Sequence, residues 1–262
     1  MTEALVMETI RSTDTRIFNG GGCGLEWVWD RVNERYGIES TPRSYYERGT
    51  LGHAMIEAYL NDTDVGYVMD DYLPPEGDWL ETTKCTKEGM EQEVWGLYEA
   101  WVSQYKSLEE YEGWTNVECE VVLECETPNG TPIRTEADAI FSANGGGVAL
   151  ADWKLGTSKS GMAMQLYLYW YCMRRRGYAL SDDPFRAWFH YPSYSKPIVH
   201  ITGYPGDEYI EAYVDYAQEQ RLKGPYLPNP DWFRCSQCEW KDKCPLWGGE
   251  YEETRKIEVR IV

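Results

Sequence analysis

Long hydrophobic runs are absent from this chain of 262 residues. No stretch approaches the roughly 20 consecutive apolar residues that a membrane-spanning helix needs. The first ten residues carry Glu3 and Glu8 instead of the basic start and apolar core of a secretory signal. Internal repeats and low-complexity segments are also lacking, and hydrophobic residues make up 42% of the chain. We therefore expect a globular, cytoplasmic protein that does not engage a membrane.

Positive charge is scarce as well. The chain has 25 Lys and Arg residues against 44 Asp and Glu residues, which gives a formal net charge of −19. Proteins that coat nucleic acid are usually basic, because neutralising phosphates supplies most of their non-specific affinity. The charge balance excludes a general DNA-coating protein. It still allows an enzyme that meets DNA through a local basic rim and through cations bound by its carboxylates.

Eight cysteines in a chain without an expected export signal indicate metal binding or buried thiols more than disulfides. Three of them form the pattern Cys235-x2-Cys238-x5-Cys244, which is typical of a metal site. Cys23 lies alone near the start of the chain. Four thiolates suit zinc and iron–sulfur clusters alike, so the spacing leaves both open.

Hydrophobic periodicity predicts an alternation of helices and strands. We expect helices over 25–36, 48–60, 86–108, 160–176 and 207–222, and strands over 116–126, 133–143, 148–154, 185–191 and 198–201. The segment 61–78, rich in Asp, Gly and Pro, is expected to be a loop. This order indicates an α/β (mixed) fold in a single domain over 1–262, with a central mixed β-sheet flanked by helices. The cysteine segments 17–40 and 225–250 are expected to form a subdomain together.

The predicted hairpin around the glycine-rich turn at 144–147 is the most informative segment. Directly opposed residues of a hairpin have a constant index sum, and for Asp138 and Asp152 this sum is 290, centred on residue 145. A loop confined to 144–147 would give 291, so this register requires an odd loop or a bulge. Both carboxylates then stand on one face a few ångströms apart, and Lys154 shares that face.

Opposed acids repel each other on a hairpin, and a divalent cation would remove the repulsion. Oxygen ligands suit Mg²⁺ or Mn²⁺, and Lys154 can orient or deprotonate an attacking water. The alternative is that this face of the hairpin simply meets solvent. The apolar neighbours Ala149, Leu150 and Trp153 disfavour it.

Two predicted helices add polar pairs with helical spacing. His53 and Glu57 lie on one face of the helix over 48–60, and Gln165 and Tyr169 lie on one face of the helix over 160–176. Each pair alone is commonplace, since a His–Glu pair is usually a surface contact and a Tyr-rich helix usually packs. Their significance comes from their combination with the acidic hairpin.

In that combination the chain resembles the RecB-like branch of the PD-(D/E)xK nuclease superfamily, through the ordered motifs Gly52-His53-xxx-Glu57, Asp138, Asp152-x-Lys154 and Gln165-xxx-Tyr169. Cys23 and the downstream cysteine triplet resemble the iron–sulfur subset, which includes the CRISPR-associated exonucleases. All motifs together span residues 23–245. The third motif departs mildly, because Asp152 stands where Glu is commoner. Glu136, two residues before Asp138, is a further acid on that face if the strand is regular.

The resemblance implies a hydrolase, an exonuclease that cuts phosphodiester bonds at single-stranded DNA ends. Its cation, Mg²⁺ or Mn²⁺, would be held by His53, Asp138, Asp152 and the Trp153 carbonyl. The implied catalytic set is Lys154, Asp138, Asp152, Gln165, Tyr169 and Glu57. The resemblance also implies a 4Fe–4S cluster at Cys23, Cys235, Cys238 and Cys244 that joins the N- and C-terminal segments.

Two rival hypotheses remain. One is a catalytically idle assembly module for DNA processing that keeps an iron–sulfur or zinc centre as a scaffold. The other is a zinc-stabilised domain whose acidic hairpin faces solvent. Strand polarity, endonuclease behaviour, RNA as substrate, homo-oligomer formation and a partner from recombination, CRISPR adaptation or phage replication stay open.

Overall fold

The computed structural model describes residues 4–6, 9–11, 14, 17, 44–72, 86–144, 146–156, 162–223 and 258–260. The chain divides into two compact units. The terminal unit comprises Met1–Thr41, Glu124–Arg134 and Gly206–Val262, and the sheet unit comprises Pro42–Leu123 and Thr135–Pro205. The four predicted cluster cysteines and the predicted helix over 25–36 lie outside the described residues. Of the cysteine segments 17–40 and 225–250, only residue 17 is described.

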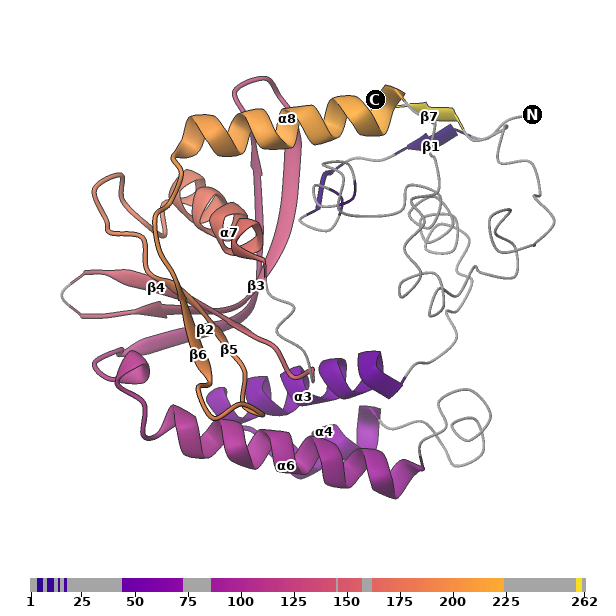
Figure 1. Cartoon of the computed structure of the whole chain (residues 1–262), viewed down its shortest axis with the longest axis vertical. Helices are drawn as coiled ribbons and strands as arrows, with labels where there is room; N and C mark the ends of the chain where they lie inside the picture. The colour runs from indigo at the N-terminus through magenta and orange to yellow at the C-terminus, as the bar shows by residue number, and fades with distance from the viewer. Residues whose placement is uncertain are drawn as a thin grey trace. The chain divides into compact units, whose positions relative to one another are not determined.

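The larger of the two described sheets is a five-stranded mixed sheet with the strand order β2-β3-β4-β5-β6 (Figure 1). Its strands are β2 (Asn116–Glu126), β3 (Pro132–Ser142), β4 (Val148–Trp153), β5 (Ala187–His190) and β6 (Ile198–Ile201). The pairs β3–β4 and β5–β6 are antiparallel, whereas β4 and β5 are parallel. A parallel pair needs a crossover connection, and α7 (Ala163–Arg176) supplies it. The predicted mixed α/β class is confirmed.

Helices α3 (Ser44–Leu60) and α6 (Lys87–Tyr105) pack against each other within the sheet unit (Figure 1). Thr86 caps α6, because its hydroxyl accepts a hydrogen bond from the Gly89 amide at 3.1 Å. The Trp101 side chain of α6 is fully buried in the core beside Trp153 of β4. Side chains alternate along a strand, so Trp153 points to the face opposite to that of Asp152 and Lys154. Helix α6 therefore packs on that opposite face.

The predicted loop over 61–78 is wrong in part, because it contains helix α4 (Val65–Tyr72). Val65, Val68 and Met69 of this helix pack on a buried cluster that includes Leu51 and Met55 of α3. These three residues have the i, i+3, i+4 spacing of a helical face. Burial of that face outweighs the polar residues around it, which were the reason to expect a loop.

The register of the β3–β4 hairpin is the one that the sequence predicts. Ala139 pairs with Ala151, and Ser142 pairs with Val148, so the index sum is 290 throughout the ladder. Five residues, 143–147, connect the two strands. The odd loop is closed by the Ala143 amide, which donates to the Gly147 carbonyl at 3.2 Å.

The terminal unit contains α8 (Asp207–Lys223) and a parallel pair of short strands, β1 (Ala4–Val6) and β7 (Glu258–Arg260). The carboxylate of Asp215 on α8 accepts hydrogen bonds from three side chains of the turn between β2 and β3, Thr127, Asn129 and Thr131, at 2.5–2.8 Å. This clamp holds the turn against α8. Among the described helices, none is long and apolar enough to cross a membrane.

Candidate metal centre

A row of polar side chains runs from the end of β4 to α7. The Lys154 ammonium lies 2.5 Å from Oδ2 of Asp152 and donates to Oε1 of Gln165 at 3.2 Å. Gln165 in turn donates from Nε2 to the Tyr169 hydroxyl at 2.5 Å. The structure thus brings four of the predicted residues into one continuous chain of contacts, and Asp152 is fully buried at its end.

Asp138 reaches the same place from β3. It lies one residue before the Ala139–Ala151 pair at the end of the described ladder, and its Oδ2 accepts a hydrogen bond from the Trp153 amide at 2.6 Å. The Asp138 carboxylate therefore accepts the hydrogen bond that a backbone carbonyl of β3 would otherwise accept from the Trp153 amide. Asp138 is 7% exposed. Because both acids of the hairpin are buried, the hypothesis of a hairpin that faces solvent is wrong.

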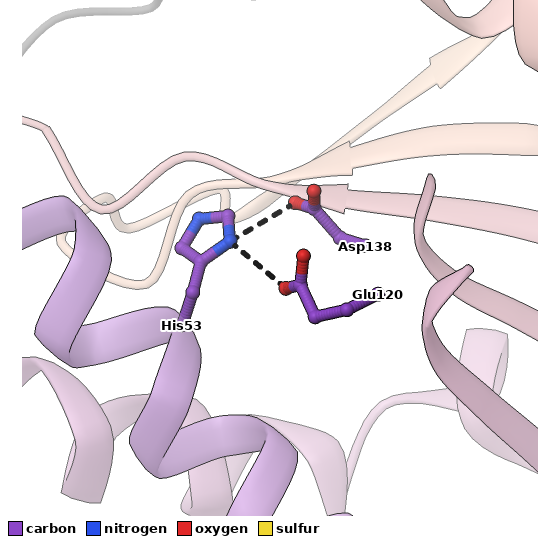
Figure 2. Close-up of side chains that lie close together, drawn as sticks. All are labelled: His53, Glu120 and Asp138. Atoms are coloured by element: carbon purple, nitrogen blue, oxygen red, sulfur yellow. Dashed lines mark ion pairs between the residues drawn. The ribbon is translucent and has the colours of Figure 1, made fainter. Parts of the chain in front are cut away.

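His53 approaches from α3, and its two ring nitrogens have different neighbours. Nε2 lies 2.9 Å from the Trp153 carbonyl oxygen, whereas Nδ1 lies 3.6 Å from Oδ2 of Asp138 (Figure 2). The helix can come this close because the preceding residue is Gly52. A Cβ atom at Gly52 would overlap the side chain of Leu155, just beyond β4. The glycine of the predicted motif thus has a packing reason.

Glu120 of β2 is a site residue that the sequence analysis missed. Its Oε1 lies 3.5 Å from Nδ1 of His53, and ligand atoms of His53, Glu120 and Asp138 lie within 4.8 Å of one another (Figure 2). Glu120 has φ +49°, a left-handed conformation that is rare for a side chain other than Gly, Asn or Asp. Acids alternate along β2 as on any solvated strand face, so no sequence signal distinguishes Glu120 from Glu118.

Burial and mutual repulsion raise the pKa values of the acids. Burial raises the pKa of Asp138, and burial together with the neighbouring Asp138 carboxylate raises the pKa of Asp152 to about 7. Burial alone would lower the pKa of His53, but Asp138 and Glu120 raise it to about 9. The pKa of Lys154 is likewise raised, because Asp152 and Asp138 outweigh its burial. Lys154 therefore carries a full positive charge at neutral pH.

Glu57, one turn after His53, borders the site. Burial raises its pKa first, and the carboxylates of Glu120 and Glu136 raise it further. Glu136 itself is exposed. These acids extend the negative potential of the site toward solvent, as the alternation of β3 predicts for Glu136.

The donor set fits a divalent cation. Oδ1 of Asp152 is buried and has no hydrogen-bond partner within the described part of the chain. Carboxylate oxygens with one imidazole nitrogen suit hard or borderline cations such as Mg²⁺ and Mn²⁺. The acids lie on the Nδ1 side of His53 and the Trp153 carbonyl lies on the Nε2 side, so the imidazole separates the two groups of candidate ligands.

Comparison with known proteins gives a family match over most of the chain. A family model described as the PD-(D/E)XK nuclease superfamily matches residues 15–245. A structure from Eubacterium rectale named "Putative exonuclease" is 12% identical, covers 81% of this chain and 78% of its own, and has a TM-score of 0.47. The structure of SSO0001 is 18% identical, with 91% and 86% covered and a TM-score of 0.43. No curated protein matches the chain.

Proposed function

The chain belongs to the PD-(D/E)XK nuclease superfamily, and from this premise we propose that it is an exonuclease that hydrolyses phosphodiester bonds at single-stranded DNA ends with a divalent cation. Membership makes it a nuclease, a hydrolase of nucleic acid. The observation that carries cation-dependent hydrolysis is that Asp138, Asp152 and Lys154 lie together on one buried face of the hairpin. A solvated charge cluster would not be buried in this way.

We propose that His53, Asp138 and Asp152 hold the cation, Mg²⁺ or Mn²⁺, and that the Trp153 carbonyl joins them once the imidazole, which lies between it and the acids, turns aside. The orphaned Oδ1 of Asp152 supports this assignment, because a buried carboxylate oxygen without a partner is costly unless a ligand satisfies it. A cation bound there would polarise the scissile phosphate and lower the pKa of an attacking water. Glu120 and Glu57 would add negative charge around it.

Lys154 would orient the attacking water and stabilise the charge that develops on the phosphate. Its raised pKa supports the role of a fixed cation over that of a base. Tyr169 accepts from the amide nitrogen of Gln165 and so turns the amide oxygen toward the ammonium of Lys154. Asp152 holds the same ammonium from the other side, so Lys154 has a defined position before substrate arrives.

The preference for single-stranded ends comes from the resemblance to the RecB-like branch. The proposal also keeps a 4Fe–4S cluster at Cys23, Cys235, Cys238 and Cys244 and a location in the cytoplasm. The cysteine spacing supports a metal centre, and the resemblance favours 4Fe–4S over zinc. The parallel pairing of β1 with β7 supports a junction between the two ends of the chain. A partner from recombination, CRISPR adaptation or phage replication would fit this assignment.

Digestion of end-labelled linear and circular single strands, with Mg²⁺ or Mn²⁺, tests the function. We expect the wild-type protein to degrade the linear strand and leave the circle intact. Lys154→Ala and Asp138→Asn should lower the cleavage rate about a hundred- to a thousandfold, whereas the exposed control variant Asp182→Asn should match the wild type. Cleavage of the circle would make the enzyme an endonuclease, and equal activity of all variants would overturn the active-site assignment.

A further inference from the structure

A buried imidazole lies on the face of the sheet opposite to Asp152, and both of its nitrogens have hydrogen-bond partners. His190, the last residue of β5, is fully buried and is the parallel partner of Trp153. The Tyr111 hydroxyl lies 2.7 Å from Nδ1, and Oε1 of Gln104 lies 2.7 Å from Nε2. The Trp101 ring stacks on the imidazole with centroids 6.2 Å apart and meets Trp153 edge-on at 5.4 Å. None of these side chains belongs to the acidic face.

The ends of this chain of hydrogen bonds determine where its protons lie. Gln104 donates from Nε2 to the Pro192 carbonyl at 3.1 Å, so its Oε1 accepts the proton of Nε2 of His190. Nδ1 of His190 then accepts from the Tyr111 hydroxyl, which itself accepts from the indole of Trp188 at 3.4 Å. Burial lowers the pKa of His190 to about 3, which keeps the imidazole neutral. Each donor along the chain meets an acceptor.

The backbone of His190 meets the strand that carries the acidic site. The Lys154 amide donates to the His190 carbonyl at 2.9 Å, directly after the last β4–β5 pair, Trp153 with His190. The Lys154 amide belongs to the same peptide group as the Trp153 carbonyl, and the oxygen of that carbonyl lies against His53. A side chain locked at both nitrogens leaves the His190 carbonyl little freedom. The position of the Lys154 backbone therefore depends on groups that lie on the opposite face.

We propose that Tyr111, His190 and Gln104 form a positioning device that sets the place of Lys154 through the β4–β5 backbone. The inference rests on the proposed function, since it assigns the purpose of that position to catalysis. His190 is a positioning residue that touches neither substrate nor cation. Removing one hydrogen-bond partner leaves a buried polar group unsatisfied and loosens the end of β4.

Amide hydrogen exchange tests the device without any need for nuclease activity. We expect the Lys154 amide to exchange about tenfold faster in Tyr111→Phe and in Gln104→Leu than in the wild type. The Leu150 amide, which donates to the Arg186 carbonyl near the start of the same strand pair, should be unchanged. Tyr105→Phe is the matched control, because its ring stacks on Trp101 in the same core. Equal acceleration at Leu150 and Lys154, or none at Lys154, would overturn the proposal.

Steady-state kinetics then separate positioning from mere folding. We expect Tyr111→Phe to lower kcat about tenfold while KM for a DNA end stays constant. In the Lys154→Ala background, Tyr111→Phe should cause no further loss, because the residue through which it acts is gone. Additive losses in the double variant would overturn action through Lys154. An inactive wild-type protein would instead refute the proposed nuclease function, and the exchange experiment would still decide the inference.

Discussion

Nδ1 of His53 lies 3.5 Å from Oε1 of Glu120, in a contact that joins helix α3 to strand β2 (Figure 2). Neither the local pattern of the helix nor that of the strand indicates this pair. The same ring reaches the Trp153 carbonyl through Nε2. One imidazole thus links the acids of two strands to the backbone of the acidic hairpin.

Loss of the Glu120 carboxylate should weaken binding of the cation. We expect Glu120→Gln to raise the Kd for Mn²⁺ about 10–100-fold, because groups that contact a metal-binding histidine contribute on this scale. Titration calorimetry measures the change. Glu118→Gln is the matched control, since Glu118 is an exposed acid two residues earlier on β2. Equal affinities of the two variants would exclude Glu120 from the site.

The left-handed backbone at Glu120 gives a second, separate prediction. Glycine adopts φ +49° without strain, so we expect the free energy of unfolding of Glu120→Gly to exceed that of Glu120→Ala by about 1 kcal/mol. Both variants should lose affinity for the cation. Urea unfolding of the two variants measures the difference. If the glycine variant is less stable than the alanine variant, then residue 120 does not need a left-handed backbone in the folded protein.

The stability of the metal-free protein should fall as pH rises. The pKa of Asp152 is raised from 3.8 to about 7 in the folded protein, so its contribution is complete near pH 4 and is lost as pH approaches 7. The pKa of His53 is raised from 6.5 to about 9, so its contribution is complete below pH 6.5 and is lost as pH rises through 9. Both effects have the same sign.

Thermal unfolding in the presence of a chelator measures this trend. We expect Tm to drop by roughly 5 °C or more between pH 5 and pH 8, and added Mn²⁺ to restore it most strongly at pH 8, where protons compete least for the ligands. Asp152→Asn should flatten the part of the curve below pH 7. A Tm that rises steadily with pH would contradict the raised pKa values.

The orientation of Gln165 should matter for turnover. Tyr169→Phe removes the acceptor that holds the Gln165 amide, so we expect kcat to fall about tenfold with little change in KM. Tyr167→Phe is a control on the same helix, since its hydroxyl donates to the Thr202 carbonyl instead. Equal losses in both variants would show that only helix packing was disturbed.

The Asp215 clamp should affect stability and not chemistry. Asp215→Ala breaks three hydrogen bonds to the turn between β2 and β3, and we expect it to cost about 2–3 kcal/mol of unfolding free energy. The kcat of the folded fraction should stay at the wild-type value. Chemical denaturation and initial rates measure the two quantities, with the exposed Glu208→Gln on α8 as control. A loss of kcat without loss of stability would contradict a structural role.

The cysteine cluster should act as a clip. Cys238→Ala should remove the brown colour of an iron–sulfur protein and lower Tm, because joining Cys23 to the distant cysteine triplet restricts a loop worth about 4–5 kcal/mol of chain entropy. Visible absorbance and metal analysis distinguish iron from zinc. A colourless wild-type protein that contains zinc would refute the 4Fe–4S assignment, and an unchanged Tm would refute the clip.

The register of the acidic hairpin could be predicted because it depends on local geometry. Side chains alternate along a strand and a tight turn relates two strands by a constant index sum, so Asp138 and Asp152 face each other whenever the loop between the strands is odd. The i, i+4 spacing likewise indicated that His53 and Glu57 share a helix face. The connecting loop has five residues, 143–147, and is therefore odd as this register requires.

Other parts of the site depend on packing between distant segments. Glu120, itself left-handed, lies beside His53, and α4 forms where apolar residues meet α3. The Lys154 amide finds its acceptor in the His190 carbonyl on another strand. Short-range periodicity determined which residues share a face of each element. Which face meets which, and which buried groups find partners there, was decided only by the tertiary structure, because burial energies depend on contacts between segments far apart in the chain.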